Sequence, residues 1–167
     1  MPSVPGFIRK ICEEKLIHVK SADLLKLITT QLSSLSESQL ERAQAYIAIN
    51  NASKFGIVEI VSEFIKCNPN LQFSTDTESR DIFQIAAMHR QEKVFNLIYD
   101  MRNKKMITVR GDKSYNNLLH TVGLKTSSLQ LDKISGAALQ MQRELQWFKV
   151  IDLLTHEGLY SFSPNLK

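Results

Sequence analysis

The sequence predicts an all-α protein in which a short stack of helical repeats lies between an N-terminal helical region and a C-terminal helix. Apolar residues recur at three- and four-residue steps over much of the chain, as they do along one face of an α-helix. A helix–turn–helix pattern also recurs with a period of about 34 residues, which is typical of stacked repeats. The chain has 167 residues, 43% of them apolar and 23% charged, so it can enclose one modest core, and wholesale disorder is excluded.

The N-terminal region is predicted to be helical from just after Gly6. The polar residues 33–38 end this helix. Ser38, with Glu41 three residues later, has the spacing of a capping box and predicts the start of a second helix. Residues 1–44 are therefore expected to form a helical cap or linker. Apolar positions share one face of the first helix, at Ala22, Leu25, Ile28, Leu32 and Leu35.

The first copy of the repeat unit is predicted between residues 46 and 65. Residues 46–54 form one helix and residues 57–65 a second, and Gly56 lies in the tight turn between them. Asn68 and Pro69 end the second helix, because proline lacks the amide hydrogen and disfavours helix in the residue before it. A polar connection then leads to the next copy.

The second copy repeats this pattern one period later. Residues 81–87 are predicted as its first helix, residues 89–90 as the turn, and residues 91–101 as the second helix. A third, degraded copy begins at residue 116, and an insertion at residues 124–133 displaces its second helix. A stack of two to three repeats cannot bury its own end faces, so we expect the flanking helices to cover them.

The C-terminal helix is predicted from about residue 135 to residue 156. Within its apolar pattern Phe148 is expected to belong to the core stripe, with Trp147 beside it. Residues 45–157 are thus expected to hold the degenerate repeats and this helix, and residues 158–167 a disordered tail.

Two repeat classes have a period close to this one, the tetratricopeptide and the ankyrin repeat. The ankyrin class is favoured because the connection from Ile65 to Arg80 is long, mostly polar and contains a proline. Such a connection is required for the finger, the long loop that joins one ankyrin unit to the next. Residues 80–87 have the register of the ankyrin Gly-x-Thr-Pro-Leu-His-x-Ala-Ala run, with Gln84 in place of histidine, and His120 keeps that histidine in the third copy. We expect its ring to bond to backbone in the finger turn.

Small residues are also part of the ankyrin pattern. Ala86 and Ala87 are predicted to let the first helix of the second copy approach its neighbour closely. In the first copy the corresponding helix carries Asn50, Asn51 and Ser53 at positions that favour apolar or small residues. These three residues, together with Gln84 in the second copy, are expected to weaken the stack.

Three longer segments carry a more specific resemblance, namely residues 57–61, 89–99 and 136–149. They resemble the plant ankyrin-repeat proteins of the accelerated-cell-death class, which carry a C-terminal PGG membrane domain. The resemblance covers roughly residues 4–149. It implies a protein-interaction role in stress or defence signalling, with membrane-anchored members whose repeats face the cytosol. The transmembrane helices and Pro-Gly-Gly motif of that family do not occur in this chain, so we expect a truncated, cytoplasmic member.

Charge and hydropathy exclude some functional classes. The net charge of +4 suits an anionic lipid or nucleic acid, but the basic residues are interleaved with acids, which favours a solvated surface over nucleic-acid binding. The longest uncharged stretches, residues 43–53 and 114–124, have eleven residues each, against about 18 for a membrane span. No secretory signal is seen, and Cys12 and Cys67 are expected to be reduced core residues.

No constellation for catalysis, metal or cofactor binding is found in the sequence. The four histidines never have the i, i+4 spacing of a helical metal pair, and neither a glycine-rich phosphate loop nor a Gly-x-Ser-x-Gly motif occurs. The sequence therefore predicts a non-enzymatic protein–protein interaction module, with an anionic-lipid or nucleic-acid binder as the alternative. Its protein partner is expected at finger tips and at variable positions after the paired alanines, namely Glu78, Arg80, Met88, His89, Lys113 and Tyr115.

Overall fold

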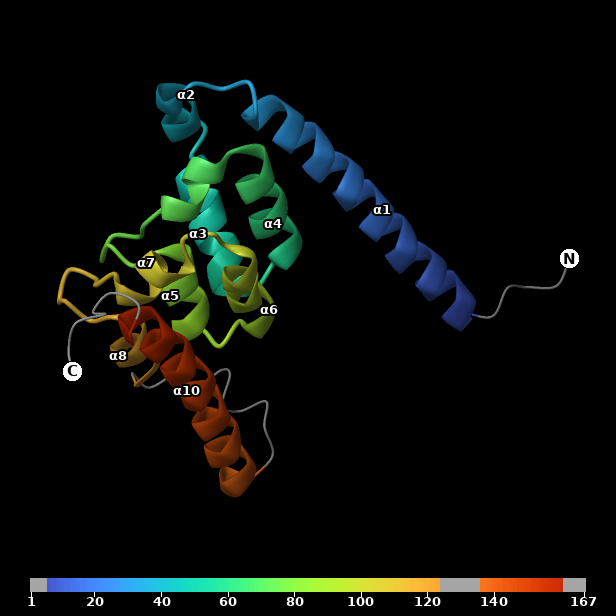
Figure 1. Ribbon diagram of the computed structural model, residues 1–167. Coiled ribbons are helices and arrows are strands. Elements are labelled where there is room, and N and C mark those ends of the chain that lie inside the picture. Colours follow the sequence, from blue (N-terminus) through green and yellow to red (C-terminus); the bar gives the residue numbers. More distant parts are fainter. Residues whose placement is uncertain (1–5, 124–135, 161–167) are drawn as a thin grey trace, which may run out of the picture.

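The computed structural model describes the backbone of residues 6–123 and 136–160, and the side chains of residues 9–123 and 136–156. Within these ranges the chain is helical, with one isolated β-bridge between Thr75 and Asp81 and no strand. The all-α fold class is confirmed for this part of the chain (Figure 1). In chain order the α-helices and the 3-10 helices η1 and η2 are α1 (Gly6–Leu32), α2 (Glu37–Arg42), α3 (Ala45–Phe55), α4 (Val58–Cys67), η1 (Pro69–Phe73), α5 (Ile82–Met88), α6 (Glu92–Phe95), η2 (Asn96–Asp100), α7 (Lys104–Val109), α8 (Leu118–Gly123) and α10 (Ala137–Tyr160).

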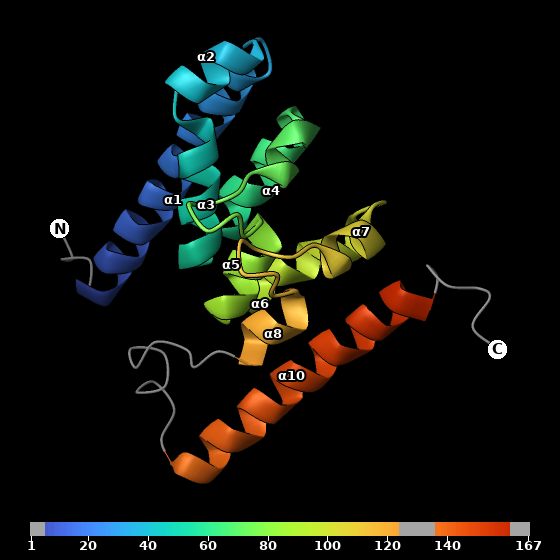
Figure 2. The same cartoon turned by 90° about the vertical axis from the view of Figure 1, so that its left-hand side faces the viewer.

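Two helix pairs follow each other with the predicted period. Gly56, with φ of 74°, joins α3 to α4, and Arg90, one period later and with φ of 55°, lies between α5 and α6. Helix α5 packs against α3 on one side and α8 on the other, while α4 lies between α1 and α6. Figure 2 shows α3, α5 and α8 in succession toward α10. Each pair thus buries its neighbour's apolar surface.

Helix α5 lies at the centre of this arrangement. All its residues from Ile82 to Ala87 are buried, and Ala86 and Ala87 have no exposed surface. Side chains this small let two helix backbones approach each other, as expected at a close helix contact. The core continues into α4 and α6 through Val61, Val94 and other apolar side chains.

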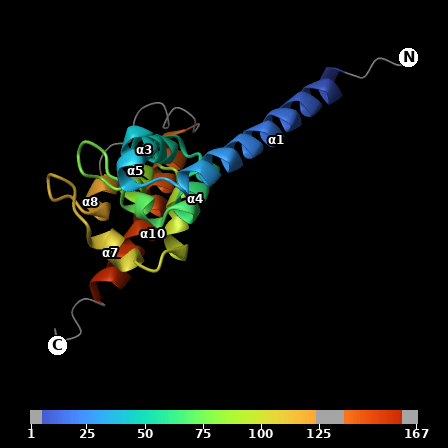
Figure 3. The same ribbon diagram turned by 90° about the horizontal axis from the view of Figure 1, so that it is seen from above.

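Helix α1 ends where the polar cluster was predicted, but only its C-terminal part joins the core. Leu32 is buried and Leu25 packs against the core, whereas Ile28 is 41% exposed, so the predicted apolar face is covered only in part. Figures 1 and 3 show the N-terminal end of α1 projecting away from the rest of the chain.

The predicted capping box of α2 is wrong by two positions. Ser36 and Gln39, rather than Ser38 and Glu41, form the cap, and Gln39 Oε1 accepts a hydrogen bond of 2.8 Å from the Ser36 backbone N–H. The serine cluster offers several candidate caps, and Ser36 is the one with the extended backbone that a capping residue needs, with φ of −72° and ψ of 164°.

Helix α10 covers α7 and α8 at the end of the stack. Here the predicted roles of two aromatic residues are reversed: Trp147 is buried, at 9% exposure, whereas Phe148 is 38% exposed. The Trp147 ring meets Phe95 edge to face at 5.3 Å, and its Nε1–H donates to the Ala87 carbonyl at 3.2 Å. Arg90 adds an ion pair of 2.6 Å to Glu144. The turn between α5 and α6 is thereby tied to α10.

The remaining expectations on this region have mixed outcomes. Cys12 is exposed, so its expected burial is wrong, while Cys67 is half-buried; both thiols are free. In the part of the chain that the structure describes, none of the helices has the length and apolar character needed to cross a bilayer. The expected insertion at 124–133 lies outside the described residues. The expected disordered tail at 158–167 is wrong at its start, because residues 158–160 belong to α10, and the rest of it lies outside the described residues.

Candidate functional site

Two loops of the stack are built in the same way, and we call them the first finger (residues 75–81) and the second finger (residues 111–117). In the first finger Asp76 Oδ1 accepts hydrogen bonds of 2.9 Å from the backbone N–H groups of both Glu78 and Arg80. Ser79 adopts the left-handed conformation, with φ of 61°. The carboxylate therefore closes a tight turn around itself.

The second finger repeats this turn in the next unit of the stack. Asp112 Oδ1 accepts from the N–H groups of Ser114, at 2.8 Å, and Asn116, at 2.9 Å, and Tyr115 has φ of 61°. The hydrogen bond from Asn116 and others at this turn lower the pKa of the Asp112 carboxyl, which keeps it charged. The two fingers also touch, because the Lys113 N–H donates to the Glu78 carbonyl at 2.9 Å.

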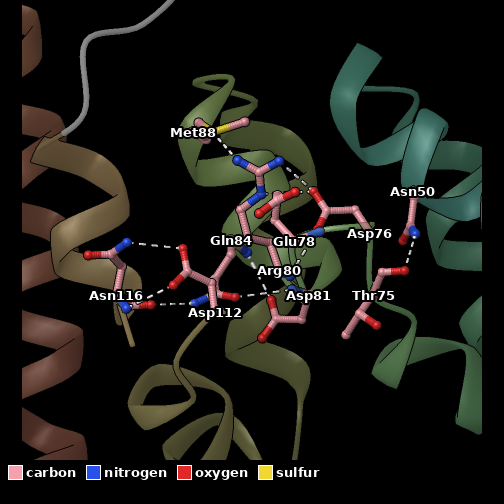
Figure 4. A network of polar contacts seen from close by, with 10 residues as sticks. All are labelled: Asn50, Thr75, Asp76, Glu78, Arg80, Asp81, Gln84, Met88, Asp112 and Asn116. Atoms are coloured by element: carbon pink, nitrogen blue, oxygen red, sulfur yellow. Dashed lines mark hydrogen bonds and ion pairs between the residues drawn. The ribbon is translucent and has the colours of Figure 1, made fainter. Parts of the chain in front are cut away.

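A side chain of the first helix in each pair, half-buried Asn50 on α3 and buried Gln84 on α5, holds a finger in place (Figure 4). On α5, Gln84 Nε2 donates to two carbonyls of the second finger and its approach, Arg110 at 3.0 Å and Asn116 at 3.3 Å. On α3, Asn50 lies one period earlier and its Nδ2 donates to the Thr75 carbonyl of the first finger at 2.9 Å. A side-chain amide thus links each helix to the finger of the following repeat.

Asp81 ends the first finger and begins α5. Its side chain accepts hydrogen bonds of 2.9 Å from the N–H groups of Phe83 and Gln84, and Gln84 Oε1 accepts one in return from the Asp81 N–H. Burial raises the pKa of Asp81 to about 6, although those N–H groups and the charge of Arg110 act in the opposite direction. A buried carboxylate therefore caps the N-terminus of α5 at its junction with the first finger.

Of the six residues predicted to bind a partner, Glu78, Arg80, Lys113 and Tyr115 lie on the two fingers, whereas Met88 and His89 lie at the C-terminal end of α5. Tyr115 is 91% exposed, and Glu78 and Lys113 are exposed as well. Arg80 is not a free tip residue: its guanidinium makes an ion pair of 2.7 Å with Asp76, and its Nη1 lies 3.3 Å from Met88 Sδ. Its side chain is used inside the first finger.

Met88 and His89 lie at the end of α5, beside this arginine. His89 is the C-terminal cap of α5, as predicted. Burial lowers the pKa of His89, and the positive charges of Lys54, Arg80 and Arg90 lower it further, so its ring is uncharged at neutral pH. The structure thus brings Arg80, Met88 and His89 together as one half-buried cluster.

His120 is placed differently from its prediction. Its ring is exposed, and Nδ1 lies 2.7 Å from Asn117 Oδ1, so the expected bond to finger backbone is wrong. His120 is the counterpart of Gln84 at the spacing that separates the two fingers. The segment after α8 lies outside the described residues, so no link from His120 to a following finger is described.

The role of the four residues that organise the fingers was not predicted from the sequence. Asp76 and Asp112 do carry a signal, because both are followed by a polar residue two positions later and by a capping residue five positions later. Gln84 and Asn50 are spaced by one period, yet their residue types suggested a weakened helix rather than a link. A search for repeated polar positions, and not only apolar ones, would have found all four.

The described surface also holds two grooves. One, of about 420 Å³, lies between α2, α3 and η1, and the Tyr46 hydroxyl on its wall donates to the Glu37 carboxylate. The other, of about 540 Å³, lies between α1 and α4 and has an apolar floor. Among the described residues no cluster of three histidine, cysteine, aspartate or glutamate side chains has the arrangement needed to hold a metal ion.

Comparison of the chain with protein-family models, with curated proteins and with solved structures finds no match. The fingers and the grooves are therefore interpreted from their own geometry.

Proposed function

We propose that the chain is a non-catalytic protein-interaction module of the ankyrin-repeat type, and that its two fingers form the partner-binding surface. The observation that carries the proposal is the repeated finger turn, in which Asp76 and Asp112 each accept two backbone hydrogen bonds at equivalent positions. The side-chain amides of Asn50 and Gln84 anchor the two turns, while Glu78, Lys113 and Tyr115 remain exposed at their tips. A rigid loop with exposed tip residues loses little conformational entropy when it binds.

The ankyrin assignment is supported by the spacing and order of the elements. Each unit has a helix, a left-handed turn, a second helix and a connecting finger, and equivalent positions recur at nearly the ankyrin period. We extend the proposal to the plant PGG-domain family and to a cytoplasmic role in stress or defence signalling, on the resemblance of residues 57–61, 89–99 and 136–149.

A site-specific crosslink tests whether the fingers bind a partner. A photoreactive phenylalanine analogue placed at Tyr115 should capture a protein from a plant cell extract, because this side chain is 91% exposed at the second finger. The matched control places the same analogue at Tyr99, which is 51% exposed on η2, away from the fingers. Capture of the same proteins from both positions would argue against a finger interface.

Affinity measurements with the captured partner complete the test. Replacing Glu78, Lys113 and Tyr115 together by alanine should weaken binding at least about 10-fold, since interface energy is concentrated in a few side chains. The matched control replaces one base, one tyrosine and one acid on α6 and η2, namely Lys93, Tyr99 and Asp100. Binding to anionic vesicles or RNA that falls steeply with salt, with no protein partner, would instead favour the alternative function.

A further inference from the structure

Helix α1 carries a second apolar face, turned away from the side that packs on the core. The core side holds Leu25, Thr29 and Leu32, and the last two are buried. Figure 1 shows the other helices on one side of α1. At 3.6 residues per turn, five large apolar residues that are 41–66% exposed lie together on another side of this helix. We call them the outer face: Leu16, Ile17, Leu24, Leu27 and Ile28.

The outer face has no covering surface in the part of the chain that the structure describes. All side chains from residue 9 to residue 24 are exposed. Figure 3 shows this end of α1 extending away from the other helices. Most helical stability in proteins comes from packing of an apolar face, and exposed apolar side chains grouped in this way mark an interaction site.

The spacing of the outer face is that of a coiled-coil seam. In a seven-residue repeat written abcdefg, Ile17 and Leu24 occupy successive a positions, and Leu27 occupies the d position after them. Lys20 holds the other d position, and it is the one charged residue among these four. Such a seam fits another α-helix with the same spacing.

We propose that the outer face of α1 pairs with the same face of a second copy, so that two chains form an antiparallel dimer with twofold symmetry. In an antiparallel pair, the a positions of one helix face the d positions of the other. A twofold axis at the level of Ala22 places Ile17 opposite Leu27 of the second copy, and Leu24 opposite Lys20 of the second copy. Each contact is made twice, so all four seam positions are matched in one register.

Lys20 determines the direction of the pairing. In a parallel pair in register, the two Lys20 side chains would face each other across the seam and repel. The antiparallel register moves them four residues apart, about 6 Å along the axis, and packs each aliphatic stem on Leu24 of the other copy. Asp23 lies three residues from Lys20 on the same edge of the seam, at the level that the ammonium group of the other copy reaches. The seam is therefore complementary to itself in one orientation, and a single polar seam residue sets register in this way in coiled coils.

The rest of each chain leaves room for this pairing. Helix α1 contacts α4 through its core side, and the groove between α1 and α4 stays outside the interface. Only the C-terminal part of α1 joins the core, so in an antiparallel pair the two folded bodies lie toward opposite ends of the paired helices.

Sedimentation equilibrium of the full chain tests for the dimer. The unaltered protein should dimerise with a dissociation constant on the order of micromolar, because a seam of two heptads is a small interface. Ile17→Asp should weaken dimerisation at least about 100-fold, since it places a carboxylate against Leu27 of the other copy at both ends of the seam. The matched control is Val19→Asp, an equally exposed β-branched position on α1 outside the seam, at 58% exposure against 63% for Ile17. It should dimerise as the unaltered chain does, and circular dichroism checks that both variants remain helical.

Chemical cross-linking tests the orientation of the two helices. The chain's own cysteines are first replaced, as Cys12→Ser and Cys67→Ser. A short bismaleimide should then join a mixture of the Ile17→Cys and Leu27→Cys variants, because these two positions face each other. Either variant alone should not be cross-linked, since its two equivalent positions lie ten residues, about 15 Å, apart along the axis.

Three results would overturn the proposal. The first is an unaltered chain that stays monomeric at the highest concentration measured, and if this monomer binds anionic vesicles through α1, the outer face is a membrane-binding surface instead. The second is an equal effect of Ile17→Asp and Val19→Asp on dimerisation. The third is cross-linking of the Ile17→Cys variant with itself, which would show a parallel pair.

Discussion

Replacing Ala86 by leucine is expected to destabilise the stack strongly. The Ala86 side chain has no exposed surface, and its helix α5 is enclosed by α3, α6 and α8. A leucine adds three carbon atoms where no space is left, so side chains or helices must shift. Overpacking of this kind costs about 1–3 kcal/mol, against about 5–15 kcal/mol for the stability of a whole domain.

Urea unfolding followed by far-ultraviolet circular dichroism measures this loss. With a typical slope of about 1–3 kcal/mol per molar urea, the midpoint should fall by roughly 1 M. The matched control is Ala48→Leu on α3, the same substitution at an exposed helical position, where surface changes usually stay within about 0.5 kcal/mol. Equal shifts for both variants, or none for Ala86→Leu, would refute the stacked-repeat register.

Two further substitutions test buried polar groups of the stack. Burial raises the pKa of Asp81 to about 6, so the folded chain holds this proton more tightly than the unfolded chain, and its contribution to stability falls by up to about 3 kcal/mol as pH rises from about 4 to 6. Asp81→Asn keeps an oxygen for the cap and should remove that pH dependence; urea midpoints of both proteins across this range check it, and a constant difference between them would contradict it. Ser53 Oγ is buried with no hydrogen-bond partner among the described residues. Ser53→Ala should raise the free energy of unfolding by about 1 kcal/mol, and a loss of stability would show that the hydroxyl has a favourable contact.

The two helix pairs could be predicted from sequence because local signals agree there. The apolar steps of α3 and α4 are interrupted at Gly56, whose left-handed conformation suits glycine, and α4 ends just before Pro69. The second pair has the same apolar steps but turns at Arg90, a residue with no intrinsic preference for positive φ. There the repeat spacing, rather than the residue itself, made the turn predictable.

The aromatic residues of α10 show where local signals are insufficient. Apolar side chains such as Leu139, Phe148 and Leu153 occur around much of this helix, so periodicity does not single out one buried face. Contacts with distant segments decide it: Phe95 and the Ala87 carbonyl receive Trp147. A single sequence does not contain that information in any nearby position.

The position of the finger site could be predicted from the sequence, but the side-chain interactions that hold the fingers could not. Tip residues such as Tyr115 were expected from the length of the connections, and the structure places them at the fingers. Arg80 was grouped with them, yet its guanidinium is held by Asp76, an interaction between residues four positions apart in a loop that lacks periodicity. Hydrogen bonds of this kind follow from the turn conformation, which apolar patterns do not describe.

The position of Trp147 has a practical consequence for spectroscopy. It is the only tryptophan of the chain, and it lies buried at the junction of α10 with α5 and α6. Its intrinsic fluorescence therefore reports the detachment of the C-terminal helix, whereas circular dichroism reports the loss of all helices together. The native chain thus contains its own probe for separating release of α10 from melting of the repeats, without an introduced dye.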